Sequence, residues 1–225
     1  MNIPVVNADI SHVVWDWNGT LFNDAWLCMD AMNTLLKDRG LPLLTLERYQ
    51  RAFDFPVIRY YERLGFDFEH ESFEKLGTLF IQQYEQRRLE CDLHDGALCA
   101  LQHARNAGVS QSVLSAYKKD TLDSLLTHFG IHAFFNDVVG HADHYATGKV
   151  EQGLAWMRAS GGNPAETLLI GDTVHDHEVA SAMGIHCVLI AGGNQDRERL
   201  LACGAPLFPS LRAFMETWPL DVTGP

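Results

Sequence analysis

Val13-Val14-Trp15-Asp16-Trp17-Asn18-Gly19-Thr20-Leu21 is the stretch that decides the fold of this 225-residue chain. Its three leading apolar residues are typical of a short buried strand, and Asp16 follows them at once. Gly19 then permits a tight turn and a close approach of the backbone to a ligand. The stretch therefore predicts a strand that delivers a carboxylate and the Thr20 hydroxyl to the carboxyl edge of a sheet. Open α/β sheets bind their ligands at that edge.

The composition describes an acidic, globular protein. Hydrophobic residues make up 47% of the chain, which is enough for a sizeable core. Lysine and arginine total 17 against 29 acidic residues, a formal net charge of −12. This charge disfavours binding to nucleic acid or to an acidic membrane, because both depend on cationic side chains. An acidic protein that handles phosphate needs a local cation, either a metal ion or one well-placed lysine.

The cysteines and the N-terminal residues bear on the cellular compartment in which the protein is expected. The five cysteines are scattered and lack Cys-x-x-Cys spacing, which argues against a disulfide framework or a zinc site. The first residues contain no basic region followed by an apolar run, and no segment approaches the length of a membrane span. We therefore expect a cytoplasmic protein, a monomer or homodimer, with no membrane or nucleic-acid partner.

Residues 23–88 have helical patterns and no convincing alternating strand. Asn23 or Asp24 is expected to cap the first helix of this region. We predict a helical-bundle cap domain over residues 23–88, inserted into a catalytic core formed by residues 1–22 and 89–225.

From residue 95 the pattern changes to helices that alternate with short apolar strands. Strands of this kind, joined by helices, imply right-handed crossovers and a parallel sheet covered on both faces. The predicted fold class is α/β, a Rossmann-like doubly wound parallel sheet. Strands are predicted at residues 110–115, 137–140, 167–171 and 186–191.

Polar groups stand at three further strand ends or loops of this sheet: Ser115-Ala116, Lys149 after Gly148, and Gly171-Asp172 with Asp176 four residues later. A hydroxyl beside a free N–H suits a phosphate oxygen, and a lysine supplies a cation. Individually, the hydroxyl and the carboxylates can be helix N-caps and the lysine a surface charge. Their combination at one sheet edge favours a shared site.

In this order, the four signals resemble the complete motif set of the haloacid dehalogenase superfamily, whose first motif is usually Asp-x-Asp-Gly-Thr. The resemblance covers essentially the whole chain, and Gly171-Asp172 with Asp176 is its most specific part. The helical insertion resembles the cap of the phosphoglycolate phosphatase and β-phosphoglucomutase branch. The resemblance implies a Mg²⁺-dependent phosphatase that acts on a small phosphorylated metabolite.

The resemblance also implies a role for each matched residue. Asp16 is expected to attack phosphorus and form an aspartyl-phosphate. Mg²⁺ is expected on Asp16, the backbone carbonyl of Asn18, and Asp172. Asp176 would orient Lys149 or a metal-bound water. The phosphoryl oxygens would be held by the phosphate-binding residues Ser115, Ala116 (through its N–H), Lys149, Gly19 and Thr20.

Asn18 departs from the family pattern. In the family's phosphatases this position is an Asp that protonates the leaving oxygen and then deprotonates the attacking water. An amide can do neither, and such help is typically worth about a hundred- to ten-thousand-fold in rate. One interpretation is a slow or specialised phosphatase in which another group, a cap side chain or a histidine such as His175, supplies the proton.

Two other interpretations stay open. Asp16-Trp17-Asn18-Gly19-Thr20 resembles Asp-Trp-Ala-Gly-Thr of phosphonoacetaldehyde hydrolase, which cleaves a C–P bond. That chemistry needs a cap lysine for a Schiff base, and the cap offers only Lys37 and Lys75. The third interpretation is a non-catalytic phosphate-ligand-binding or regulatory protein, or a chain in which Asn18 was introduced to trap a complex.

Substrate choice would be set by the cap, around Phe55 and Arg59. An arginine can hold a substrate carboxylate by a two-point contact. The ordinary alternative is that Phe55 belongs to the core and Arg59 is a solvated helix residue.

Overall fold

A computed structural model describes residues 9–141 and 148–218. Within these residues, six parallel strands form one sheet in the order β3-β2-β1-β4-β5-β6. This is the doubly wound order in which the chain reverses its direction of winding at β1. The strands are β1 (His12–Trp15), β2 (Ser110–Lys118), β3 (Asp137–His141), β4 (Thr167–Gly171), β5 (His186–Ile190) and β6 (Leu207–Phe208).

Strand β1 lies between β2 and β4, with Trp15 paired to Val113 on one side and to Ile170 on the other. The ends of these three strands therefore reach the same edge of the sheet side by side. That edge is the switch point at which doubly wound sheets bind ligands. The predicted fold class is confirmed by this topology.

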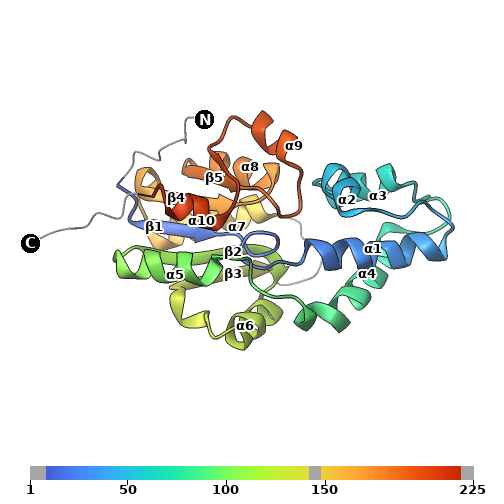
Figure 1. The fold of residues 1–225 in the computed structure, drawn as a ribbon, viewed down its shortest axis with the longest axis horizontal. Coiled ribbons are helices and arrows are strands. Elements are labelled where there is room, and N and C mark those ends of the chain that lie inside the picture. The colour runs from blue at the N-terminus through green and yellow to red at the C-terminus, as the bar shows by residue number, and fades with distance from the viewer. Residues whose placement is uncertain (1–8, 142–147, 219–225) are drawn as a thin grey trace, which may run out of the picture.

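Helices cover both faces of the sheet (Figure 1). Alternate residues of β1 point to opposite faces, so Val14 packs with α7 and α8 residues, while Val13 and Trp15 pack with α5, α6 and α10. The core helices are α5 (Ala97–Asn106), α6 (Lys119–His128), α7 (Lys149–Ser160), α8 (Val174–Met183), α9 (Arg197–Ala202) and α10 (Leu211–Met215), with 3-10 turns at Arg88–Glu90, His132–Phe134 and Pro164–Glu166.

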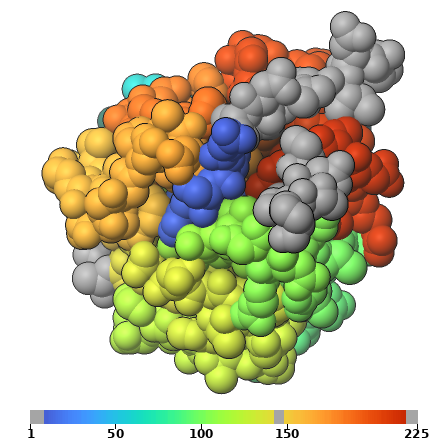
Figure 2. Space-filling model, turned by 90° about the vertical axis from the view of Figure 1, so that its left-hand side faces the viewer, coloured from blue at the N-terminus to red at the C-terminus, as the bar shows by residue number. Residues whose placement is uncertain are grey.

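Four helices between β1 and α5 pack around a buried cluster of their own, and we call them the helical unit. Figure 1 places them beside the sheet, to the right of the core. Figure 2 views the opposite end of the molecule, where the start of β1 lies between core segments. The domain boundaries at residues 22/23 and 88/89 stay predictions. The unit contains α1 (Ala25–Asp38), α2 (Leu46–Ala52), α3 (Val57–Leu64) and α4 (Phe73–Arg87).

Local chemistry explains where the structure differs from the predicted elements. Helix α8 begins at Val174 because Thr173 and Asp176 form a capping box. Strand β2 continues to Lys118 through an irregularity after Leu114. The short elements α9, β6 and α10 were not predicted, since none is long enough to display a period.

The described part of the chain contains no helix with the length and apolarity needed to cross a membrane.

The buried cluster of the helical unit should contribute strongly to stability. Leu76 is fully buried in that cluster, so Leu76→Ala should lower the free energy of unfolding by about 2–5 kcal/mol. Leu43 is 54% exposed, and Leu43→Ala should change the free energy of unfolding by less than about 0.5 kcal/mol. Denaturant unfolding measures both, and equal effects would contradict the packing described here.

Candidate active site

The carboxyl edge of the sheet forms the floor of a cavity of about 210 Å³ that the helical unit covers. The strand-end residues predicted to work together all line this cavity: Asp16, Asn18, Ser115, Ala116, Lys149, Asp172 and Asp176. Gly19 and Thr20 lie buried immediately behind them. Residues from four separate segments of the chain thus converge because their strands or helices begin or end at one edge.

Lys149 is the electrostatic centre of this cavity floor. It opens α7, is only 4% exposed, and places Nζ 2.5 Å from Asp16 Oδ1 and 2.5 Å from Asp176 Oδ1. Burial alone lowers the pKa of Lys149, but the two carboxylates outweigh it and raise that pKa above its ordinary value. The lysine is therefore a fixed cation.

Asp176 is held so firmly that it acts as an anchor for the lysine. Its Oδ2 accepts hydrogen bonds from the Thr173 hydroxyl at 2.6 Å and from the backbone N–H groups of Thr173 and Asp172 at 3.0 and 3.2 Å. Burial favours the neutral acid, but Lys149 outweighs it and holds the pKa of Asp176 below its usual range. Its role in orienting Lys149 is thus consistent with the geometry.

Thr20 and Gly19 bring the first strand end against Asp172. The Thr20 hydroxyl lies 3.1 Å from both Asp16 Oδ2 and Asp172 Oδ1, where it bridges the two carboxylates. Gly19 has φ +79°, and a Cβ there would lie 2.2 Å from Asp172 Oδ2. Only glycine at position 19 lets the backbone come this close to Asp172. Gly19 and Thr20 therefore shape the loop from behind the cavity.

The carboxylates form a site with the chemistry of a divalent-cation centre. Asp16, Asp172 and Asp176 each offer an oxygen, and these oxygens lie within 4.8 Å of one another. Burial raises the pKa of Asp16 to about 6, against the opposing effect of Lys149. Burial, then the charges of Asp16 and Asp176, raise the pKa of Asp172 well above its usual value. One lysine does not balance three buried carboxylates, and an oxygen-liganded divalent cation fits the remaining charge.

Asn194 is a site residue that the sequence reasoning missed. Its backbone N–H donates to Asp172 Oδ2 at 2.5 Å, and its side-chain Nδ2 donates to the backbone carbonyl of Asn18 at 3.2 Å. Its Oδ1 accepts from the Tyr49 hydroxyl of α2 at 2.8 Å. The available signal was a polar residue in a Gly-containing turn after the apolar strand β5.

The side chain of Asn18 belongs to a second buried network. Its Nδ2 donates to Asp24 Oδ2 at 2.7 Å and lies 3.1 Å from the Tyr84 hydroxyl, which itself donates to Asp24 Oδ2 at 2.6 Å. Asp24, one of the two residues expected to cap the first helix, is the N-cap residue of α1, but its carboxylate makes no capping hydrogen bond. It instead accepts from the Gly19 N–H at 3.0 Å.

The two residues expected to set specificity lie in different surroundings. Phe55 lines the cavity and stacks on His175, with ring centroids 4.6 Å apart. Arg59 is exposed on α3 and is not among the residues that line the cavity. A contact between Arg59 and a bound substrate is therefore not supported by this arrangement.

The chain matches one family model over residues 13–190, that of the haloacid dehalogenase-like hydrolases. Among curated relatives, tyrosine-protein kinase PtkA of Mycobacterium tuberculosis is 27% identical over 186 residues, 80% of this chain and 62% of the relative. The chain thus spans less than two thirds of the length of that relative. A phosphoglycolate phosphatase of Pseudomonas syringae is 24% identical over 191 residues, 80% of this chain and 69% of the relative.

Solved structures share the fold. The crystal structure of a predicted phosphatase from Clostridium acetobutylicum has a TM-score of 0.78 at 18% identity, with 92% of this chain and 97% of that chain covered. The structure of PtkA from M. tuberculosis has a TM-score of 0.77 at 24% identity, with 95% and 99% covered. The resemblance noted in the sequence is confirmed at the level of the family and the fold.

A divalent cation should stabilise the protein more above pH 7 than near pH 5. The pKa of Asp16, raised to about 6, leaves its carboxyl mostly protonated near pH 5 and mostly ionised near pH 7.5, and only the ionised form is a good ligand. A cation present at about 100 times its Kd adds about 2.7 kcal/mol to the free energy of unfolding. For a domain of this size, that gain raises Tm by roughly 5–10 °C. Thermal unfolding with and without Mg²⁺ as the probe measures the shift at both pH values.

Matched variants make this measurement specific. Asp172→Asn should abolish the shift, whereas Asp38→Asn, at an exposed carboxylate of α1, should preserve it. A shift of equal size at both pH values, or one that survives in Asp172→Asn, would show that the cation binds elsewhere.

Proposed function

Because the chain belongs to the haloacid dehalogenase-like hydrolases, we propose that it is a phosphatase that hydrolyses a small phosphorylated metabolite. The observation that carries this proposal is the Asp16 carboxylate, which stands between the Lys149 ammonium and the Thr20 hydroxyl on the floor of a covered cavity. The phosphoglycolate phosphatases among its relatives support a phosphatase as the kind of hydrolase.

The proposed reaction has two displacements at phosphorus. In the first, a carboxylate oxygen of Asp16 bonds to phosphorus, and the P–O bond to the alcohol breaks with its electron pair on the departing oxygen, which takes up a proton from water because Asn18 cannot supply one. In the second, water attacks the aspartyl-phosphate, inorganic phosphate leaves, and Asp16 is regenerated. Lys149 and Ser115 line the same cavity as Asp16, where they would neutralise and orient the phosphoryl oxygens.

We propose Mg²⁺ as the cofactor, held by Asp16, Asp172 and the backbone carbonyl of Asn18. When bound, the ion supplies positive charge against the negative charge of the phosphoryl group. Thr20 keeps the two aspartates together, and Asp176 keeps Lys149 aimed at Asp16. The protein residues thus provide a nucleophile with both of its oxygens already oriented.

The C–P hydrolase interpretation lacks a lysine in the required place. Lys37 and Lys75 of the helical unit are both exposed, and neither is among the residues that line the cavity. A Schiff base on either side chain would form outside the site. We therefore do not propose this activity.

Purified protein with Mg²⁺ should release phosphate from small phosphomonoesters, and Asp16→Asn should abolish the release. Asn18→Asp should raise kcat at least tenfold, because a carboxyl can transfer the proton that the amide cannot, an effect typically of about a hundred- to ten-thousand-fold. Asn23→Asp is the matched control, since it adds the same charge at an exposed position five residues on and should leave kcat unchanged.

The outcomes separate the remaining interpretations. No phosphate release by either the native protein or Asn18→Asp would contradict the phosphatase and favour a binding protein. Because the mycobacterial relative is named as a kinase, ATP with a tyrosyl acceptor belongs in the assay. Phosphoryl transfer to tyrosine without hydrolysis of small esters would also contradict the proposal.

A further inference from the structure

We propose that the leaving group of the substrate departs as a stable anion, which makes the substrate the phosphate of a phenol, an enol or a carboxylic acid rather than of a simple alcohol. This inference rests on the proposed phosphatase function and names the substrate class of the same site. It follows from the way in which hydrogen bonds and ion pairs commit the polar groups around Asp16.

The acidity of the leaving group decides whether its departure needs a proton. In the first displacement, the bond between Asp16 and phosphorus forms while the P–O bond breaks, with its electron pair on the departing oxygen. A simple alcohol is about as weak an acid as water, with a pKa of about 15.7, whereas a phenol has a pKa of about 10 and a carboxylic acid of about 4. An alkoxide therefore needs a proton donor to leave readily, whereas a phenolate, an enolate or a carboxylate does not.

The side-chain amide of Asn18 offers the cavity an acceptor. Its Nδ2 donates to Asp24 Oδ2 at 2.7 Å and to the Tyr84 hydroxyl at 3.1 Å, so both N–H groups are bonded to the protein. Its Oδ1 lies on the other side of the planar amide, 3.5 Å from Ser115 Oγ, and Asn18 and Ser115 both line the cavity. An amide oxygen accepts hydrogen bonds and donates none. Position 18 therefore cannot protonate a departing oxygen.

Asp24 does not replace the missing acid. It has no exposed surface, and both of its carboxyl oxygens are occupied by protein donors. The Gly19 N–H donates to Oδ1 at 3.0 Å, and the Tyr84 hydroxyl donates to Oδ2 at 2.6 Å, beside the Asn18 amide. The Cys28 thiol lies 3.6 Å from the same Oδ2. A leaving oxygen thus has no free atom of this carboxyl group to approach.

The donors that touch Asp16 are committed to carboxylates. Lys149 Nζ lies 2.5 Å from Asp16 Oδ1 and 2.5 Å from Asp176 Oδ1. The Thr20 hydroxyl lies 3.1 Å from both Asp16 Oδ2 and Asp172 Oδ1. The negative charge of the carboxylates holds the protons of both donors in place. These groups therefore orient the nucleophile and do not supply the leaving group with a proton.

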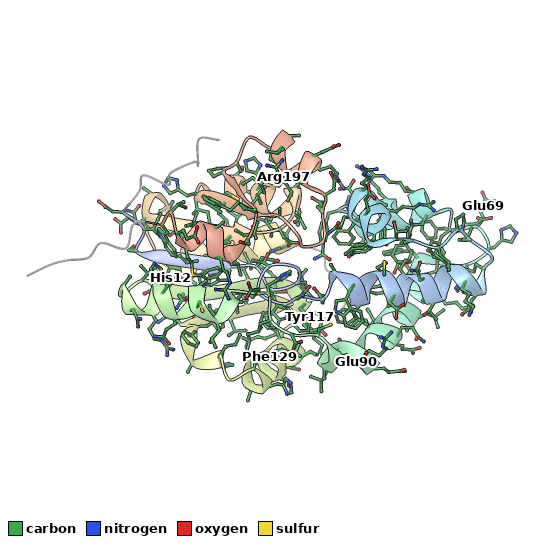
Figure 3. All side chains as sticks on the ribbon, in the orientation of Figure 1. His12, Glu69, Glu90, Tyr117, Phe129 and Arg197 are labelled. Atoms are coloured by element: carbon green, nitrogen blue, oxygen red, sulfur yellow. The ribbon has the colours of Figure 1, made fainter. Side chains whose placement is uncertain are left out.

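The tyrosines that line the cavity are poor proton donors for a leaving group. The Tyr84 hydroxyl is already bonded to Asp24. Burial raises the pKa of the other four above its ordinary value, and an efficient general acid has a pKa near the working pH. These four are Tyr49, Tyr60, Tyr61 and Tyr117, the last of which Figure 3 labels between the core and the helical unit.

His175 and Lys118 also line the cavity and are the alternatives to departure without a proton. His175 Nδ1 lies 3.0 Å from Glu178 Oε2, and the imidazole stacks on Phe55 with ring centroids 4.6 Å apart. The Glu178 side chain is 62% exposed, so this pair holds the imidazole toward the margin of the cavity. Lys118 ends β2, and its charge can balance an anion in the cavity without the loss of its proton.

Matched pairs of substrates test this inference. The pairs are phenyl and benzyl phosphate, 4-nitrophenyl and 4-nitrobenzyl phosphate, and acetyl and ethyl phosphate; in each, the first member has the more stable anion as its leaving group. The measurement is kcat/KM with Mg²⁺, because this ratio covers the steps up to departure of the leaving group and excludes the later hydrolysis of the aspartyl-phosphate. In the native protein, kcat/KM should be at least about a hundredfold higher for the first member, the lower end of the value of general acid–base help.

Asn18→Asp places a carboxyl group where the amide stands and should remove much of this selectivity. It should raise kcat/KM at least about tenfold for the esters of alcohols, and by less than about threefold for 4-nitrophenyl phosphate and acetyl phosphate. Asn23→Asp adds the same charge at an exposed position and should change neither value. The exchange Asn18→Asp/Asp24→Asn keeps one carboxyl group and one amide in contact, and it should show the same selective gain if the single variant does not fold.

His175→Gln and Lys118→Met test the alternative donors, and each should leave the ratio within every pair unchanged. A loss confined to the esters of alcohols in either variant would identify a proton donor and overturn the inference. Similar kcat/KM values within each pair in the native protein, or an equal gain for all the substrates in Asn18→Asp, would overturn the substrate class while the phosphatase stands. Hydrolysis of none of these substrates would contradict the proposed phosphatase itself.

Discussion

The enclosed ammonium of Lys149, with a carboxylate on either side, is the interaction on which this site depends. A buried charge is tolerated only with a partner, and removal of one partner from a buried pair costs about 3–5 kcal/mol. The lysine therefore fixes the start of α7 against the end of β1 and the first turn of α8. Asp176 is itself held by Thr173 and two backbone N–H groups, so Lys149 has one favourable position. The ion pair with Lys149 in turn orients the Asp16 carboxylate.

Contacts between the core and the helical unit begin beside this site, at Asp172 and Asn18. Asn194 donates to Asp172 and to the Asn18 carbonyl, and it accepts from Tyr49 on α2. The neighbouring carbonyl of Gly193 accepts from Gln50, and Gln195 donates to the carbonyl of Phe53. The loop after β5 thus contacts the carboxylate cluster on one side and α2 on the other. A displacement at Asp172 would therefore be transmitted through Asn194 to α2.

The sequence alone predicts the site residues that directly follow apolar strands. Asp16, Ser115 and Asp172 could be predicted because parallel strands end at one edge of a sheet. Asn194 follows a strand too, but the glycines before it make an ordinary turn an adequate explanation. The contact of Tyr84 with Asn18 could not be predicted, because helical spacing shows only that Tyr84 faces inward. That contact depends on how α4 packs against the turn after β1, which no local pattern encodes.

The amide at position 18 is matched to the acid at position 24. Asn18 Nδ2 is a donor facing Asp24 Oδ2, and the Tyr84 hydroxyl donates to the same oxygen. A carboxylate at position 18 would set two acceptors against each other, beside an Asp24 whose pKa burial already raises. One of the two would have to keep a proton. An Asp at position 18, which is usual in the family, and the buried Asp24 therefore cannot both be ionised. This chain retains the buried carboxyl of Asp24 and hydrogen-bonds it to an amide at position 18.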